Sequence, residues 1–132
     1  MIAKNKFENL KAWQEAHKLV IMIYSAVKNF PKEEKFRLTD QICRSASSVA
    51  ANLVEGSSRY SRKEYLQFVY FAKGSLEETK YHLLLARDLG YLKNSEYERI
   101  TGQAIDSSKL INGLITYLKA HPKDESLLGT KI

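Results

Sequence analysis

The chain has 132 residues, of which 44% are hydrophobic and 27% charged, which is ordinary for a single globular domain large enough to bury a core. Its formal net charge of +6 permits nucleic-acid binding without requiring it, and its single cysteine, Cys43, excludes an internal disulfide and fits a reducing compartment. The N-terminus lacks the apolar core of a signal peptide and no apolar run reaches the length of a membrane span, so we expect a cytoplasmic protein with no membrane partner.

The first predicted helix spans about residues 10–29 and ends before Pro31. Its apolar residues recur at steps of three and four, the spacing of one helical face: Leu10, Trp13, His17, Val20, Tyr24 and Val27. Because His17 belongs to this stripe, we expect it to be a hydrogen-bonded histidine of the core. Pro31, followed by Glu33 and Glu34, suits the start of the next helix, where a missing amide costs nothing and acidic side chains favour the helix dipole.

The second predicted helix covers about residues 33–55 and combines an apolar stripe with small neighbouring residues. The stripe consists of Leu38, Ile42, Ala46 or Ser45, Val49 and Leu53. Between Gln41 and Val54 the only charged residue is Arg44, and many of the other positions are serine or alanine. Small side chains allow two helix backbones to approach closely, so we expect this helix to have a closely packed neighbour.

The third predicted helix runs from about residue 61 to residue 89. It begins with the sequence SRKE, a capping box in which Ser61 accepts a hydrogen bond from a free helix amide while Glu64 reaches back. Gly90 is the candidate for the left-handed residue that follows the helix. Gly74 lies inside the helix, where glycine costs about 1 kcal/mol relative to alanine, so we expect it to pack closely against the small residues of the second helix.

The fourth predicted helix spans about residues 95–120, from a second capping box, SEYE, to the stop before Pro122. Its stripe consists of Ile100, Ala104, Ser107, Ile111, Leu114 and Leu118. Four helices joined by short connections predict an all-α fold, an antiparallel up-down-up-down four-helix bundle. We expect residues 1–122 to form this single domain and residues 123–132, which are polar and uncapped, to form a flexible C-terminal tail.

Three stretches are apolar over more of the helix surface than the core of a four-helix bundle requires. Residues Val20–Tyr24 read VIMIY, residues Tyr65–Ala72 read YLQFVYFA, and the second helix has no charged face over almost four turns. A helix that is apolar on all sides is buried on all sides, so we expect the bundle to form a homo-oligomer. The alternative is that the tyrosines place their rings on the core and their hydroxyl groups in water.

No pattern of residues indicates catalysis, a metal or a cofactor. His17, His82 and His121 lack metal-ligand spacing, and no glutamate is followed by histidine at the third position as in di-iron bundles. Glu78 and His82 lie four residues apart, which is more typical of a surface hydrogen bond than of half a metal site. Cys43 has no evident base beside it and is expected to be buried and unreactive. We therefore expect a protein without a cofactor that is not an enzyme.

The stretch between the second and third helices contains the candidate nucleic-acid-binding residues Arg59, Tyr60, Arg62 and Lys63. Arg62 and Lys63 fall in the first turn of a helix, where positive charge opposes the helix dipole. The basic groups and the free helix amides could hold a phosphate, while Tyr60 could stack on a base. The alternative, which a single chain slightly favours, is a solvated turn whose charges confer solubility. An oligomer would repeat the cluster and strengthen weak binding.

Several stretches of the chain, in this order, resemble a bacterial four-helix bundle family that includes the 23S rRNA intervening-sequence proteins. They are LKAWQEAHKLV at 10–20, FPKEEKFRLTDQICRSASSVAANLVEGSSR at 30–59 and AKGSLEETKYHLLLARDLGYL at 72–92, within a similarity that covers about residues 7–119. The resemblance implies an up-down bundle that assembles as a homopentamer. Some members are encoded within insertions in 23S rRNA genes. A related protein, the accessory subunit of diversity-generating retroelements, is a basic pentamer that binds a reverse transcriptase and nucleic acid. The family has no established catalytic residue to carry over.

Two functions follow from these observations. The first is a non-enzymatic, basic, homo-oligomeric protein, pentameric by resemblance, that binds RNA or DNA or serves as a scaffold; it predicts binding that weakens as salt rises. The second is an adaptor that binds a protein partner, such as a reverse transcriptase, without binding nucleic acid; it predicts that capture of the partner is insensitive to nuclease.

Overall fold

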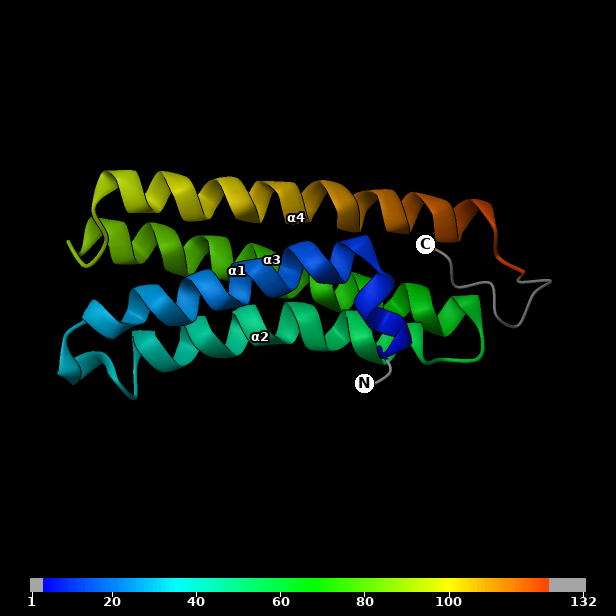
Figure 1. Ribbon diagram of the computed structural model, residues 1–132, viewed down its shortest axis with the longest axis horizontal. Helices are drawn as coiled ribbons and strands as arrows, with labels where there is room; N and C mark the ends of the chain where they lie inside the picture. The colour runs from blue at the N-terminus through cyan, green and yellow to red at the C-terminus, as the bar shows by residue number, and fades with distance from the viewer. Residues whose placement is uncertain (1–3, 124–132) are drawn as a thin grey trace.

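The computed structural model describes residues 4–123, which form four long helices and three short 3-10 helices. The long helices are α1 (Lys11–Ala26), α2 (Leu38–Ser57), α3 (Arg62–Asp88) and α4 (Asn94–Ala120). The short ones are η1 (Lys6–Asn9), η2 (Val27–Asn29) and η3 (Lys32–Glu34). Figure 1 shows each long helix running back alongside the one before it. The described residues contain no strand, and the expected all-α four-helix fold is confirmed.

Two other expectations concern the C-terminal residues and the membrane. The expected tail, residues 123–132, lies outside the described residues apart from Lys123. Among the helices of residues 4–123, none combines the length and the apolar character that crossing a bilayer requires.

The connection between α1 and α2 differs from the prediction that the second helix would start at about residue 33. The residues after Pro31 form only the short η3, and α2 begins at Leu38 because Arg37 has φ −121° and ψ −110°, outside the helical region. Glu34 therefore precedes α2. Its carboxylate oxygen Oε1 accepts a hydrogen bond from the Leu38 amide at 3.1 Å, which satisfies one of the free amides at the helix start.

The two predicted capping boxes have different outcomes. At the start of α3, the Ser61 hydroxyl oxygen accepts a hydrogen bond from the Glu64 amide at 3.1 Å, as expected of the N-cap residue. At the start of α4, the predicted cap at Ser95 is wrong, because the helix begins one residue earlier and its N-cap residue is Lys93, whose side chain makes no capping hydrogen bond. Gly90 has φ +84°, the left-handed conformation expected of the residue that ends α3.

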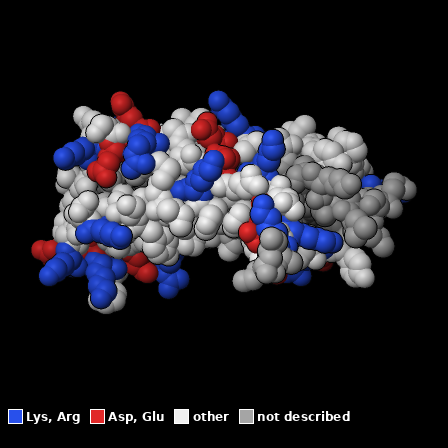
Figure 2. Space-filling model, viewed as in Figure 1, with Lys and Arg blue, Asp and Glu red and all other residues white. Residues whose placement is uncertain are grey.

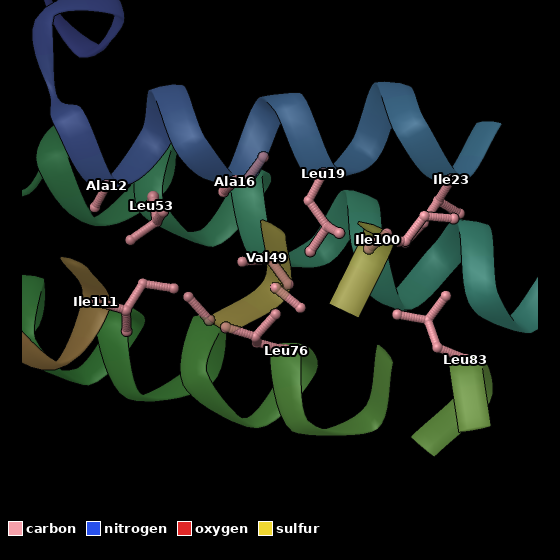
Figure 3. Packing of buried hydrophobic residues seen from close by; sticks show 14 of the residues in the cluster. Ala12, Ala16, Leu19, Ile23, Val49, Leu53, Leu76, Leu83, Ile100 and Ile111 are labelled. Atoms are coloured by element: carbon pink, nitrogen blue, oxygen red, sulfur yellow. The ribbon is translucent and has the colours of Figure 1, made fainter. Parts of the chain in front are cut away.

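A single hydrophobic core runs between the four helices, and Figure 3 shows side chains from all of them meeting there. The predicted stripes of α2 and α4 are confirmed, since every member is buried. Of the stripe predicted for the first helix, only Leu10, just before α1, is buried, and the prediction is wrong for the helix itself, whose buried residues are Ala12, Ala16, Leu19, Ile23 and Ala26. Three of the five are alanines. The helix therefore presents its smaller side chains to the bundle and leaves the larger Trp13, Val20 and Tyr24 at its flank or surface.

The surface of α1 carries an aromatic group instead of a core histidine. His17 is exposed, so the prediction that it belongs to the core is wrong. Its ring stacks on Trp13, with 4.8 Å between the ring centres and 10° between the planes. Phe7 of η1 meets the same indole at 69°, with 5.1 Å between ring centres. The three rings make the first turns of α1 a large, partly apolar surface.

The close approach of α2 and α3 occurs at Gly56, whereas the sequence pointed to Gly74. A Cβ atom at Gly56 would lie 2.9 Å from the Cβ atom of Phe68 and 3.0 Å from a ring carbon of Tyr65. Gly74 is exposed, and a Cβ atom there would meet nothing within 4 Å. The prediction that Gly74 packs against α2 is therefore wrong, and the residue that requires glycine lies at the end of α2.

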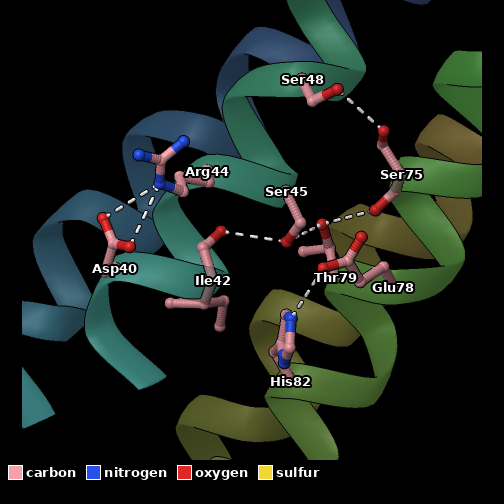
Figure 4. Close-up of polar contacts among 9 residues, drawn as sticks. All are labelled: Asp40, Ile42, Arg44, Ser45, Ser48, Ser75, Glu78, Thr79 and His82. Carbon is pink, nitrogen blue, oxygen red and sulfur yellow. Dashed lines mark hydrogen bonds and ion pairs between the residues drawn. The ribbon is translucent and has the colours of Figure 1, made fainter. Parts of the chain in front are cut away.

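Hydroxyl groups join α2 to α3 inside the bundle (Figure 4). The hydroxyl oxygens of Ser48 and Ser75 lie 2.8 Å apart, and Thr79 Oγ1 lies 2.8 Å from Ser45 Oγ. Ser45 and Thr79 are both buried. Since a buried hydroxyl group without a hydrogen bond is costly, these pairs favour one register of the two helices over others.

Candidate nucleic-acid interface

The candidate residues lie at the bend between α2 and α3, at the end of the bundle where α4 also ends (Figure 1). We call Arg59, Tyr60, Arg62 and Lys63 the bend cluster. Two backbone hydrogen bonds close the bend, from the Ser58 amide to the Glu55 carbonyl oxygen and from the Arg59 amide to the Gly56 carbonyl oxygen. The four side chains of the cluster have different surroundings, so the structure separates their roles.

Arg62 is turned into the bundle and is only 6% exposed. Its guanidinium carbon lies 5.2 Å from the ring centre of Tyr117, and Nη1 donates to the carbonyl oxygen of His121 at 3.5 Å. Both partners belong to the end of α4. Arg62 therefore holds the start of α3 against the end of α4, and its guanidinium does not share the surface of the other three cluster residues.

Arg59 is held in place at the surface. Its Nη2 atom lies 2.7 Å from Oε2 of Glu55, and its guanidinium carbon lies 4.6 Å from the ring centre of Phe68. The side chain is 38% exposed, so the ion pair is a surface one, worth at most about 1 kcal/mol. Such a pair orients the guanidinium without removing it from the reach of a phosphate.

Tyr60 and Lys63 are the members of the cluster that face solvent most openly. Tyr60 is 93% exposed, so one face of its ring at least is open for stacking. Lys63 is exposed in the first turn of α3. The structure thus leaves a phenol ring and a primary amine open to solvent, three residues apart at the bend.

A groove beside Lys63 adds a cation that sequence reasoning missed. It is lined by Arg62, Lys63, Leu66, Leu118, Lys119 and Pro122 and has a volume of about 310 Å³. Lys119 comes from α4, more than 50 residues after the bend cluster. Only the pairing of the start of α3 with the end of α4 brings it there. A signal local to the bend could not have revealed it.

Positive charge predominates at this end of the bundle. We call the basic end the set of lysines and arginines in and before η1, at the start of α1, in the bend cluster and at the end of α4: Lys4, Lys6, Lys11, Arg59, Arg62, Lys63, Lys119 and Lys123. Among the described residues, the acidic ones in or next to these segments are Glu8, Glu55 and Glu64. On the face that Figure 2 shows, acidic side chains over the left and centre of the view lie among basic ones.

The surplus of apolar surface predicted from the sequence is present on the single chain. In the stretch Val20–Tyr24, Ile23 is buried, whereas Ile21 is 56% and Tyr24 49% exposed. On α3, Tyr70 and Phe71 are also exposed. Ile21 and Tyr24 belong to the second half of α1, away from the basic end, whereas Tyr70 borders that end, since the Nζ atom of Lys119 lies 5.9 Å from its ring centre.

The residues considered for metal or redox chemistry make ordinary contacts. His82 Nε2 lies 3.1 Å from Glu78 Oε2, the expected hydrogen-bonded pair (Figure 4). Within residues 4–123, no group of three or more histidine, cysteine, aspartate or glutamate side chains is placed to hold a metal ion. Cys43 is half-buried, and this burial raises the pKa of its thiol, which lowers its reactivity.

Comparisons with known proteins agree with the resemblance noted in the sequence. The model of the 23S rRNA-intervening sequence protein family matches residues 8–113, which include the bend cluster. A crystal structure from Bacteroides thetaiotaomicron VPI-5482, described as a protein with unknown function from the S23 ribosomal protein family, is 27% identical with a TM-score of 0.73, over 79% of this chain and 97% of that one. A search of curated proteins found no match. Because the family model spans most of the chain, the protein belongs to the 23S rRNA-intervening sequence protein family.

Proposed function

We propose that this protein is a non-enzymatic, homo-oligomeric protein of the cytoplasm that binds RNA or DNA through the basic end of the bundle. The observation that carries the proposal is the surplus of positive charge around the bend, where Tyr60 and Lys63 are open to solvent. Lysine and arginine gain affinity for nucleic acid by releasing the counterions of its phosphates. An exposed tyrosine among these cations adds a stacking surface that accepts any base.

The members of the basic end have different roles in this proposal. Lys63, Lys119 and the open side of Arg59 contact phosphates, and Tyr60 stacks on an unpaired base. Arg62 is buried, so it serves the site by holding α3 against α4. The site therefore prefers a single strand or a loop, where bases are free to stack.

Self-association is the second part of the proposal. It is supported by the exposed apolar residues on α1 and α3, among them Ile21, Tyr24 and Phe71, which a partner subunit would cover. The family resemblance implies five subunits. Five copies of the basic end on one particle would convert a weak phosphate site into a useful one, because linked sites bind with higher avidity.

The proposal is tested with fluorescently labelled RNA and DNA oligonucleotides titrated with the protein at several salt concentrations. We expect the logarithm of the affinity to fall linearly with the logarithm of the salt concentration. Lys63→Ala should weaken binding and reduce this slope by about one per lost contact, and Tyr60→Ala should weaken binding with little change of slope. The matched control is Lys28→Ala, which removes one exposed charge at the opposite end. Equal effects of Lys63→Ala and Lys28→Ala would contradict the site.

The exposed apolar residues also favour a second candidate function, an adaptor that docks a protein partner on the side of the bundle. In that case the charges of the basic end serve solubility. Capture of the same partner from a lysate before and after nuclease treatment separates the two. Loss of capture after nuclease supports the nucleic-acid proposal, and unchanged capture supports the adaptor.

A further inference from the structure

Three aromatic rings contact one another at the surface where α1 begins, and we call Phe7, Trp13 and His17 the aromatic stack. The imidazole of His17 lies nearly parallel to the indole of Trp13, with 10° between the two planes, and Phe7 meets the same indole at 69°. His17 is exposed, and its ring nitrogens make no hydrogen bond within residues 4–123. The stack therefore ends in a ring whose outer face is open to solvent.

The aromatic stack lies on the side of α1 that leads to the bend cluster. Trp13, His17 and Tyr24 are separated by four and seven residues, so they share one face of the helix. This face borders α2, because the hydroxyl oxygens of Tyr24 and Ser47 lie 3.4 Å apart. Figure 1 shows α2 running back alongside α1, so the path from Tyr24 to Trp13 is matched on α2 by the path from Ser47 toward the bend. The short helix η1, which contains Phe7, also packs against α2.

Exposed lysines flank the aromatic stack. Lys6 of η1 and Lys11, the first residue of α1, are both exposed, and neither forms an ion pair within residues 4–123. The neighbouring carboxylates have other partners: Glu8 accepts a hydrogen bond from the Asn5 amide at 2.9 Å, and Glu15 pairs with a lysine of the next turn. Open aromatic rings beside cations are the combination that binds single strands, because the bases stack while the phosphates meet the cations.

The stack also orders the ring that a base would meet. Trp13 supports one face of the His17 imidazole, with 4.8 Å between the ring centres. Tyr60, at 93% exposure, contacts no aromatic ring or cation within residues 4–123. A side chain that is ordered before binding loses less conformational freedom when the ligand arrives. The aromatic stack is therefore a preorganised surface for one face of a base.

We propose that the aromatic stack is a second stacking position for the strand bound at the bend, with one unpaired base on the open face of His17 and neighbouring phosphates at Lys6 and Lys11. This assignment rests on the proposed function and extends its site from the bend across the end of α2 to α1. Bases of a duplex stack on one another, so the position accepts a base from a single strand or a loop. Contacts at both positions raise the affinity of one strand, because the second contact is made within the same complex.

The fluorescence of Trp13, the only tryptophan of the chain, reports on this position. The full chain is titrated with a single-stranded oligonucleotide and with an abasic oligonucleotide of the same length, which carries the same phosphates without the bases. We expect the first to change the emission of Trp13 over the concentrations at which the labelled oligonucleotide binds. The abasic strand should bind more weakly and leave the emission nearly unchanged at saturation.

Variants of His17 separate stacking from other effects. His17→Ala should weaken oligonucleotide binding about five-fold or more, the contribution of one base stacked on an aromatic ring, without changing the salt slope or the affinity for the abasic strand. His17→Phe restores a ring without the imidazole nitrogens and should recover most of the lost affinity. Ser25→Ala, at an exposed position near the other end of α1, is the control and should bind like the natural chain.

Three results would overturn the stack assignment and leave the site at the bend. They are binding of the labelled oligonucleotide without a change in Trp13 emission, an equal change with the abasic strand, and unchanged affinity of His17→Ala. Emission that follows the protein concentration and ignores the oligonucleotide would place the stack in a contact between subunits, which also overturns the assignment. Failure of every chain to bind any oligonucleotide overturns the proposed function itself, and the assignment with it.

Discussion

The guanidinium carbon of Arg62, the first residue of α3, lies 5.2 Å from the ring centre of Tyr117 in the last turn of α4. The same pairing recurs at the other end of the two helices, where Arg87 lies 4.7 Å from the ring centre of Tyr97. α3 supplies both arginines and α4 both tyrosines, so the helix pair is joined near both ends by a cation on an aromatic ring. Such a contact is worth about 2 kcal/mol when desolvated and less at the surface. Of the two arginines, Arg62 is buried and Arg87 is not.

Replacing Arg62 with alanine should therefore destabilise the protein by about 2 kcal/mol or more, because the packed stem, the ring contact and the hydrogen bond to His121 are lost together. Arg87→Ala should cost about 1 kcal/mol or less. Urea unfolding followed by circular dichroism measures both. The control is Lys63→Ala, which removes an exposed neighbour and should leave the free energy of unfolding within about 0.5 kcal/mol. A harmless Arg62→Ala would contradict the assignment of Arg62 to the α3–α4 contact.

Two glycine-to-alanine replacements should change the free energy of unfolding in opposite directions. Gly56→Ala places a methyl group 2.9 Å from the Cβ atom of Phe68, which forces α2 and α3 apart and should cost about 1–3 kcal/mol. Gly74→Ala places the methyl group in open space in the middle of a helix and should stabilise the protein by about 1 kcal/mol. Thermal and urea unfolding of the two single variants measure the difference. Equal effects of the two changes would contradict the close approach at Gly56.

The contrast between these glycines shows which features of the fold can be read from sequence. Helix positions follow from periodicity and stop signals, so the four elements could be predicted to within a few residues except at the start of α2. The glycine that permits a close helix contact depends on where two helices cross, which periodicity does not contain. Gly74 draws attention because it interrupts a helix, whereas Gly56 is hidden at a helix end where glycine is common.

The prediction of which face of α1 is buried is wrong for a related physical reason. Trp13, His17 and Val20 repeat with helical spacing as well as Ala12, Ala16 and Leu19 do, and a search for large apolar residues selects the wrong set. A core that brings helices close together favours alanine, and a search for large apolar residues passes alanine over. Charge and capping alone predict the position of the bend cluster. The burial of Arg62 and the presence of Lys119 in the groove wall depend on the packing of α3 against α4, which those local signals do not contain.

Acid should weaken the connection between α1 and α2 through Glu34. Its carboxylate accepts hydrogen bonds from the Tyr91 hydroxyl group at 2.8 Å and from the Leu38 amide, and these lower the pKa of Glu34 from its ordinary value, the Tyr91 bond most. A carboxyl group with a lower pKa in the folded state stabilises the protein above its unfolded pKa, about 4.3, and this stability is lost as the pH falls through the folded pKa.

Tyr91→Phe removes the larger of these two effects. The difference in urea midpoint between the variant and the natural chain should therefore be constant from pH 7 to pH 5 and shrink progressively below about pH 4. Tyr81→Phe, which changes an exposed tyrosine of α3, serves as the control and should show no such dependence. A difference for Tyr91→Phe that is the same at pH 7 and pH 3 would contradict the role of the hydrogen bond.

The exposed apolar residues of α1 should decide the state of assembly. Ile21 is 56% exposed in the single chain, so Ile21→Glu should be tolerated by the bundle, with little change in the circular dichroism spectrum or in the free energy of unfolding of the separated chain. In the proposed oligomer the same change buries a carboxylate against apolar surface of a neighbour, which is costly unless the charge is paired. Light scattering should then show the natural chain as an oligomer and the variant as a smaller species at the same micromolar concentration.

Phe36→Ser is the matched control, because Phe36 is exposed in the connection between η3 and α2, at the end of the bundle far from the basic end. Its mass should equal that of the natural chain. A natural chain that scatters as a clean monomer would refute the burial argument, and a variant of unchanged mass would move the contact surface away from α1.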